Sequence, residues 1–165
     1  MVKKRESCRN FNGKKVSEED LEKIIRAANL APSACNAQPY SFIAVTEDYL
    51  RLEIAKEMQS FNQKAGAFII IFEEKACIPV KVINTFKVQD YTKIDIGIVA
   101  SYICLAATEL KIATCMIGLF NENKIKQILK MEQKRIRLII SLGYNEEKPR
   151  PKQRKSVDNI YKCFY

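Results

Sequence analysis

The sequence predicts a single compact domain in which helices and strands alternate in layers. Its 165 residues, 47% of them hydrophobic, suffice for one core and are too few for two ordinary domains. Along the chain, apolar residues switch repeatedly between helical and strand-like spacing. The five glycines are too scattered for a glycine-rich phosphate loop, which disfavours the common nucleotide-binding folds. The direction of the strands cannot be read from this pattern.

The first helix is predicted directly after Ser17. The Ser17 hydroxyl can cap the helix, and the three acidic residues that follow suit its positive end. Apolar residues then recur at helical spacing until Pro32 ends the helix. These apolar residues are Leu21, Ile24, Ile25, Ala28 and Leu30 or Ala31.

Seven further elements follow this helix. The patterns predict strands over residues 41–46, 67–72, 113–117 and 135–142, and helices over 48–61, 92–111 and 121–131. Residues 73–91 show no clean period, which indicates a loop or a mobile helix. The helix over 92–111 is apolar nearly all round, so we expect burial on several sides, for which a second subunit is one natural source. From Asn145 the tail is polar, and Pro149 and Pro151 keep it extended.

The amino-acid composition excludes several kinds of catalytic and metal site. With no histidine, the chain lacks Ser-His and Cys-His nucleophile pairs, so chemistry carried by a bound cofactor is favoured over hydrolysis. The six cysteines form no C-x-x-C pair and have no histidine to complete a zinc site. We therefore expect no metal, and free buried thiols in a reducing compartment.

The chain also lacks the signals of export and of membrane insertion. Residues 1–11 are charged and polar, unlike a secretory signal. The longest apolar stretch, 94–107, is interrupted by Asp95 and is too short to cross a bilayer. We expect a cytoplasmic protein with no membrane association.

The net charge of +9 is concentrated in two segments near the chain ends. Arg5, Ser7 and Arg9 alternate, so an extended chain points all three to one side, with the Arg5 and Arg9 backbones about 13 Å apart. Lys152 and Arg154 share one side of a proline-stiffened segment. Each segment alone is typical of a solvated terminus. Together they could converge on one phosphate.

A loop over residues 31–40 joins the first helix to the first strand. It contains two prolines, several small side chains and two amides. Small side chains let a flat ring approach the backbone, and Asn36 or Gln38 could bond to the edge of such a ring. An ordinary turn with local hydrogen bonds explains the spacing equally well.

Five motifs, taken in order, resemble the nitroreductase family over nearly the whole chain. They are R-x-S-x-R-x-F, A-P-S-A-x-N-x-Q-P, D-I-G-I-x-A-S-x-x-x-L-A-A-T-E-L, T-C-M-I-G and P-K-x-R-K. The resemblance implies an α+β, three-layer sandwich with a central mixed or antiparallel sheet between helices. It also implies an interlocked homodimer with FMN at the interface, each site being built from both subunits.

The resemblance assigns roles to particular residues. Those implied to bind FMN are Arg5, Ser7, Arg9, Pro32, Ser33, Ala34, Asn36, Met116, Ile117, Gly118, Lys152 and Arg154. Arg5, Ser7, Lys152 and Arg154 would contact the phosphate, and Arg9 the pyrimidine edge, where a guanidinium favours the reduced flavin. The backbone near Ile117 and Gly118 would lie at the reactive N5, with no catalytic side chain. The four residues from 32 to 36 would come from the other subunit.

The sequence does not decide which residues form the other parts of the site. A further polar contact to the ring could come from Asn62, Gln63 or Lys64. Tyr40, Phe120 and residues 73–91 are candidates to line the substrate pocket, although core packing explains each of them equally well. The segment 73–91 matches no pattern of the family.

The function implied is an oxidoreductase that passes electrons from NAD(P)H through FMN to a nitroaromatic, a quinone or another small acceptor. The sequence does not separate this function from a flavin store or sensor without turnover, and it does not decide between NADH and NADPH. A nucleic-acid-binding module rests on the net charge alone and lacks interleaved aromatic and basic residues, so we expect no nucleic-acid partner.

Overall fold

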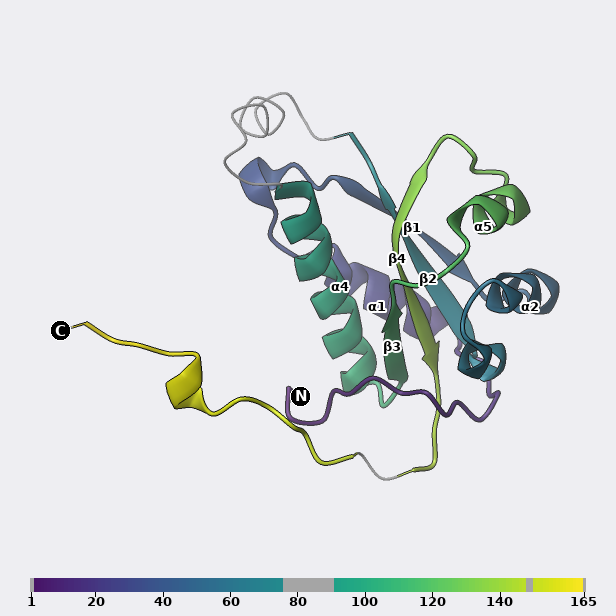
Figure 1. Cartoon of the computed structure of the whole chain (residues 1–165). Coiled ribbons are helices and arrows are strands. Elements are labelled where there is room, and N and C mark those ends of the chain that lie inside the picture. The colour runs from purple at the N-terminus through teal and green to yellow at the C-terminus, as the bar shows by residue number, and fades with distance from the viewer. Residues whose placement is uncertain (1, 76–90, 148–149, 165) are drawn as a thin grey trace.

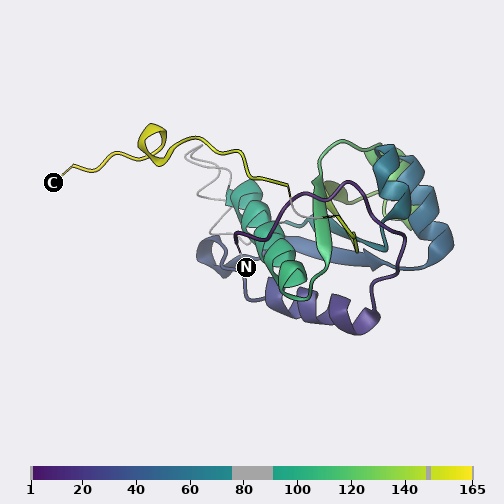
Figure 2. The ribbon, with the colours of Figure 1, turned by 90° about the horizontal axis from the view of Figure 1, so that it is seen from below.

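The computed structural model describes residues 2–75, 91–147 and 150–164, which form a three-layer sandwich with helices on both faces of one sheet (Figures 1 and 2). The sheet has the strand order β1-β2-β4-β3, and every neighbouring pair is antiparallel. The strands are β1 (Tyr40–Val45), β2 (Ala67–Glu73), β3 (Ala113–Ile117) and β4 (Arg135–Gly143). The predicted α+β sandwich is confirmed, and the strand direction that the pattern left open is antiparallel.

The two cores of the protein lie on opposite faces of β2. Its alternate side chains pack under α1 (Glu18–Ala28) and α4 (Tyr91–Glu109) on one face, and under α2 (Asp48–Lys56) and α5 (Glu122–Leu129) on the other. All six residues from Ala67 to Phe72 have no exposed surface. Burial on both faces explains why this strand is a continuous apolar run and not an alternating one.

The helix starts agree well with the sequence, but the end of α2 does not. The Ser17 side chain accepts a hydrogen bond from the Asp20 N–H at 3.1 Å, which confirms the predicted cap of α1. The helix predicted over 48–61 ends at Lys56 and is followed by a 3₁₀ turn, Ser60–Lys64. Here Asn62 bonds through its side chain to the Gln59 carbonyl and to the Ser141 hydroxyl, an alternative to helical pairing.

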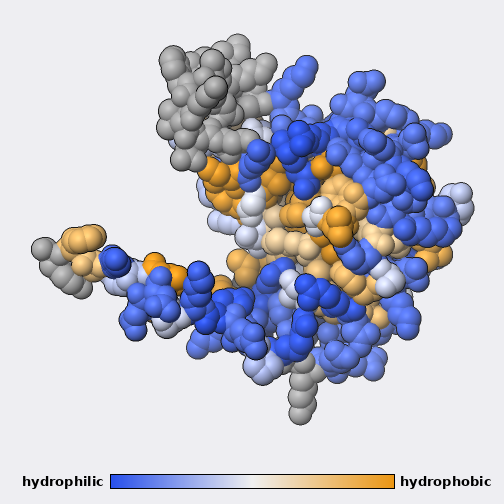
Figure 3. All heavy atoms as spheres, in the orientation of Figure 1, coloured by the Kyte–Doolittle hydropathy of each residue, from blue (hydrophilic) through white to orange (hydrophobic). Residues whose placement is uncertain are grey.

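α4 has one buried face and one face that the described chain leaves uncovered. The buried face includes Asp95, Val99 and Ile103, whereas Ile94 is 44% exposed and Tyr102 is 38% exposed. Figure 3 shows hydrophobic side chains gathered on this side of the molecule, bordered by hydrophilic ones. None of the helices in the described part of the chain combines the length and the apolar character that a transmembrane span requires.

The N-terminal segment runs along the edge of the sheet before α1 begins. Ser7 forms a parallel bridge with Thr114, and the Cys8 N–H donates to the Thr114 carbonyl at 2.9 Å. Further along, the Gly13 N–H donates to the Lys64 carbonyl at 3.1 Å. The segment then passes so close to Gly66 that a Cβ there would lie 2.2 Å from the Lys14 carbonyl oxygen.

Replacing Gly66 with alanine is therefore expected to destabilise the fold, because the new methyl group must displace backbone. We expect Gly66→Ala to lower the free energy of unfolding by about 1–3 kcal/mol, measured by urea denaturation of the flavin-free protein. Gly118→Ala is the matched control, since a Cβ at Gly118 meets nothing within 4 Å. Equal stability of the two variants would contradict this close packing of the N-terminal segment.

Candidate functional site

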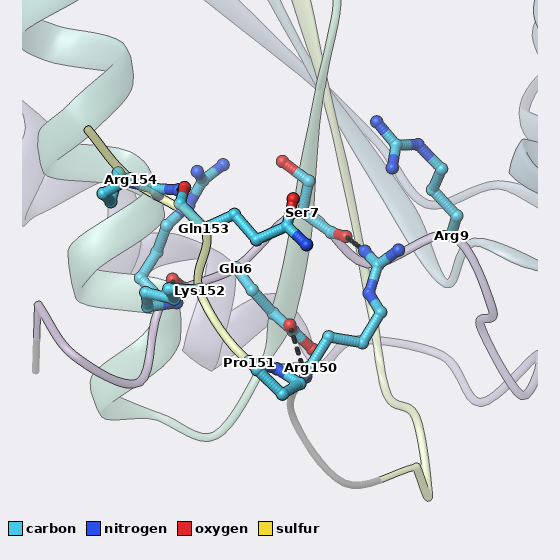
Figure 4. A pocket seen from close by; sticks show the side chains of 9 residues that line it. Glu6, Ser7, Arg9, Arg150, Pro151, Lys152, Gln153 and Arg154 are labelled. Atoms are coloured by element: carbon cyan, nitrogen blue, oxygen red, sulfur yellow. Dashed lines mark hydrogen bonds between the residues drawn. The ribbon is translucent and has the colours of Figure 1, made fainter.

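A cavity of about 680 Å³ lies between the N-terminal segment and the segment that follows residue 149 (Figure 4). Its lining residues are Arg5, Glu6, Ser7, Arg9, Arg150, Pro151, Lys152, Gln153 and Arg154. Five of these nine residues are cationic and one is acidic. Such an excess of positive charge in a concave site suits an anionic ligand.

Hydrogen bonds hold the two basic segments together. Lys152 Nζ donates to the Arg5 carbonyl at 2.5 Å, and Arg150 Nη2 donates to the Ser7 carbonyl at 2.8 Å. The Arg150 N–H donates to the Glu6 carboxylate at 3.0 Å. The two segments therefore converge, as their alternating residues suggested, and in Figure 4 Ser7 lies between Arg154 and Arg9.

Arg5 forms part of the cavity lining and contacts α4. Its Nη2 donates to the Cys104 sulfur at 3.7 Å. Burial raises the pKa of the Cys104 thiol, and the Arg5 charge opposes this shift more weakly, so the thiol stays neutral. Arg5 Nε is buried and has no hydrogen-bond partner in the described part of the chain. A buried cationic N–H without an acceptor is costly, so an anion in the cavity would relieve it.

A second cavity, of about 280 Å³, shares Arg5, Lys152 and Arg154 with the first. Its other lining residues are Val2, Ser101, Cys104, Leu105 and Met116. These side chains come mainly from α4 and β3 and are largely apolar. The two cavities together thus offer a basic end and an apolar strip, which suits a ligand with a phosphate at one end and a flat ring at the other.

The structure gathers six of the twelve predicted FMN residues at these cavities. Arg5, Ser7, Arg9, Lys152 and Arg154 line the first, and Met116 lines the second. Ile117 follows Met116 on β3 with its side chain buried, and Gly118 is exposed just beyond the strand. Neither of these two residues lines either of the two cavities, although they directly follow Met116, which lines the second.

The other four predicted residues lie at the opposite end of α4. The Ala34 N–H donates to Asp95 Oδ1 at 3.0 Å, whereas Arg5 contacts Cys104, nine residues further along the helix. At 1.5 Å per residue the two contacts are about 14 Å apart along the helix axis. Pro32, Ser33, Ala34 and Asn36 line neither cavity. Their contribution to the site of a second subunit stays a prediction.

Several residues whose role the sequence left undecided lie away from the two cavities. Asn62 is buried and bonded within the protein, while Gln63 and Lys64 are exposed. Tyr40 and Phe120, expected as candidates for one substrate pocket, pack against the cores on opposite faces of the sheet. Residues 76–90, most of the segment 73–91, lie outside the described residues.

Four lining residues of the main cavity were not among the predicted site residues: Glu6, Arg150, Pro151 and Gln153. Arg150 continues the alternation of Lys152 and Arg154 by one step, so the same spacing argument would have found it. No signal in the sequence marks Glu6, because its carboxylate accepts a hydrogen bond from a backbone group, the Arg150 N–H.

The cysteines differ from expectation in their exposure. Cys8, Cys104 and Cys115 are buried free thiols, as expected, but Cys35 and Cys163 are exposed because they lie in a surface loop and in the tail. Cys77 lies outside the described residues. Among the residues that the structure describes, no cluster of three or more histidine, cysteine or acidic side chains could hold a metal ion.

Comparison with known proteins identifies the family to which this fold and site belong. The model of the nitroreductase family matches residues 2–144. A Streptococcus pyogenes serotype M6 protein that carries the name of an NAD(P)H nitroreductase is 31% identical over 191 residues, covering 96% of this chain and 94% of that protein.

Two solved structures are similar in fold to this chain over nearly their whole length. A nitroreductase family protein from Streptococcus pneumoniae TIGR4 has a TM-score of 0.82 and 28% identity, covering 98% of this chain and 97% of that one. An FMN-dependent nitroreductase from Clostridium difficile R20291 has a TM-score of 0.78 and 27% identity, covering 99% and 98%. The protein therefore belongs to the nitroreductase family.

Proposed function

We propose that the protein is an FMN-dependent oxidoreductase that takes electrons from NAD(P)H and passes them to a nitroaromatic, a quinone or another small acceptor. The observation that carries this proposal is the cavity with five cationic side chains, one of which, Arg5, has a buried N–H without an acceptor. The names of the similar proteins from Clostridium difficile and Streptococcus pyogenes support FMN and NAD(P)H respectively.

The residues fit FMN because the charge lies at one end and the apolar strip at the other. Arg5, Ser7, Lys152 and Arg154 would hold the phosphate, where arginine forks suit its oxygens. Arg9 would approach the pyrimidine edge and stabilise negative charge there. The backbone from Met116 to Gly118 would lie beside the ring. Bound FMN supplies reversible acceptance and donation of electrons, and the chain supplies binding, orientation and electrostatics.

The active form is proposed to be a homodimer in which α4 packs against its copy. A two-fold axis with the α4 helices antiparallel would bring the 32–36 loop of one chain to the basic cavity of the other, because these features occupy opposite ends of the helix. The tail also exposes apolar side chains, which a second subunit would bury. They are Val157, Ile160, Tyr161 and Phe164, all exposed on the segment that leaves the body in Figure 1.

We also infer a cytoplasmic location and small-molecule partners. Cys35 is an exposed thiol outside any disulfide, which suits a reducing compartment. The cationic side chains line one concave site of about 680 Å³, a shape that suits a small ligand better than a nucleic-acid backbone.

The proposed activity predicts a coloured protein whose flavin reacts with a nicotinamide donor. Under anaerobic conditions, NADH or NADPH should bleach the flavin absorbance, and a nitroaromatic or quinone should restore it. Mass analysis of the released chromophore should give FMN. Flavin that binds but is not bleached by either donor would favour a store or sensor, and a protein that refuses FMN would overturn the proposal.

Arg154→Ala should weaken FMN binding through loss of a phosphate contact. A charge-assisted contact contributes about 1.5–3 kcal/mol, which corresponds to roughly a tenfold to hundredfold rise in the FMN dissociation constant. Fluorescence titration measures this, with Lys162→Ala as the control for an exposed tail charge. Riboflavin lacks the phosphate, so its affinity should respond to Arg9→Ala and hardly at all to Arg154→Ala. Equal losses for both ligands on Arg154→Ala would refute the phosphate assignment.

Ile94→Lys should separate the subunits and release FMN, because it places a charge on the uncovered face of α4. Leu52→Lys on α2 is the matched control, since Leu52 is 43% exposed and Ile94 is 44% exposed. Light scattering and flavin fluorescence should show dimer and FMN lost together in the first variant and kept in the second. A dimer that tolerates Ile94→Lys would exclude this face as the interface.

A further inference from the structure

Asp95 on α4 is a buried carboxylate that the proposed chemistry does not use. Its side chain lies in a residue that is only 2% exposed, and Oδ1 accepts a hydrogen bond from the Ala34 N–H at 3.0 Å. Oδ2 is buried without a hydrogen-bond partner among the described residues. A buried carboxylate with one unsatisfied oxygen is a poor source of stability, because its desolvation is not repaid. Its presence calls for a reason other than stability.

The loop that Asp95 contacts has an unfavourable backbone. Cys35, Asn36 and Gln38 have φ values of 51°, 53° and 46°, in the left-handed region that disfavours residues other than glycine. Three such residues within four positions must be held in place by surrounding contacts. Inside the loop, Ser33 Oγ accepts from the Gln38 N–H at 3.0 Å. The bond from Ala34 to Asp95 then fixes this strained unit to α4.

Tyr40, the first residue of β1, follows the loop directly and lies near Asp95. Its hydroxyl is buried and has no hydrogen-bond partner in the described part of the chain. Burial raises the pKa of Tyr40, and the charge of Asp95 raises it further. The Asp95 carboxylate therefore lies close enough to the first residue of β1 for its charge to be felt there, in addition to its hydrogen bond with the loop.

We propose that Asp95 is a positioning residue, whose carboxylate holds the strained 33–38 loop on α4 in the shape in which it completes the flavin site of a second copy. This inference rests on the proposed function, because it needs an FMN site to which the loop contributes. Asp95 does not touch the ligand. It acts through the backbone of Ala34, and thereby on the exposed side chain of Asn36.

Two substitutions separate positioning from general stability. Asp95→Ala removes the acceptor for the Ala34 N–H, whereas Asp95→Asn keeps an oxygen that can accept it. We expect Asp95→Ala to raise the FMN dissociation constant at least tenfold, with a free energy of unfolding equal to or above that of the wild type. Asp95→Asn should restore near-normal FMN affinity. Val99→Ala, a buried control on the same helix, should lower stability and leave the FMN affinity of the folded protein unchanged.

Hydrogen exchange of the flavin-free protein gives a second readout that needs no ligand. The Ala34 amide should exchange faster in Asp95→Ala and at the wild-type rate in Asp95→Asn. The inference is overturned if the Ala34 amide is indifferent to Asp95→Ala, or if FMN affinity falls only in step with stability, as a merely structural residue would require. A wild-type protein that binds no FMN would instead overturn the proposed function. If the wild type binds FMN and Asp95→Ala binds it equally tightly, only the role of Asp95 is overturned.

Discussion

The site depends on one backbone pairing, between the N-terminal segment and the outer edge of β3. Ser7 and Cys8 pair with Thr114, which fixes the alternation of the segment relative to the sheet. That register buries Cys8 and leaves Ser7 and Arg9 to line the cavity. A shift by one residue would exchange the two sets of side chains, because strand side chains alternate between faces. The arrangement of the cations is thus a consequence of sheet pairing.

The second basic segment is held by the first and not by the core. Lys152 and Arg150 donate to the carbonyls of Arg5 and Ser7, so backbone acceptors of the N-terminal segment bring further cations to the same cavity. Five cations around one acidic residue repel one another, and this repulsion opposes their assembly in the absence of an anion. Ligand and tail should therefore stabilise each other, as binding linkage requires.

The sequence predicted the fold well where a local pattern decides the outcome. The six buried residues of β2 and the Ser17 cap are examples, since burial periodicity and capping chemistry are both visible in the residues themselves. The early end of α2 was not predictable, because Asn62 finds its partner in Ser141, 79 residues away. For the site, the two basic segments with alternating polar side chains predicted that Arg5 and Lys152 would come together. This pattern could not reveal Glu6, whose partner is a backbone N–H, or the distance between the basic cavity and the 32–36 loop.

α4 connects these parts, since it bears Asp95 towards one end and Cys104 towards the other. A rigid helix fixes the separation of its contacts, so the loop at Asp95 and the cations at Arg5 are held about 14 Å apart in one chain. If the loop of one chain and the cations of another form one flavin site, as proposed, the face of α4 between them is the surface through which the two chains would meet. The exposed Ile94 and Tyr102 on that face then have a physical reason to be apolar.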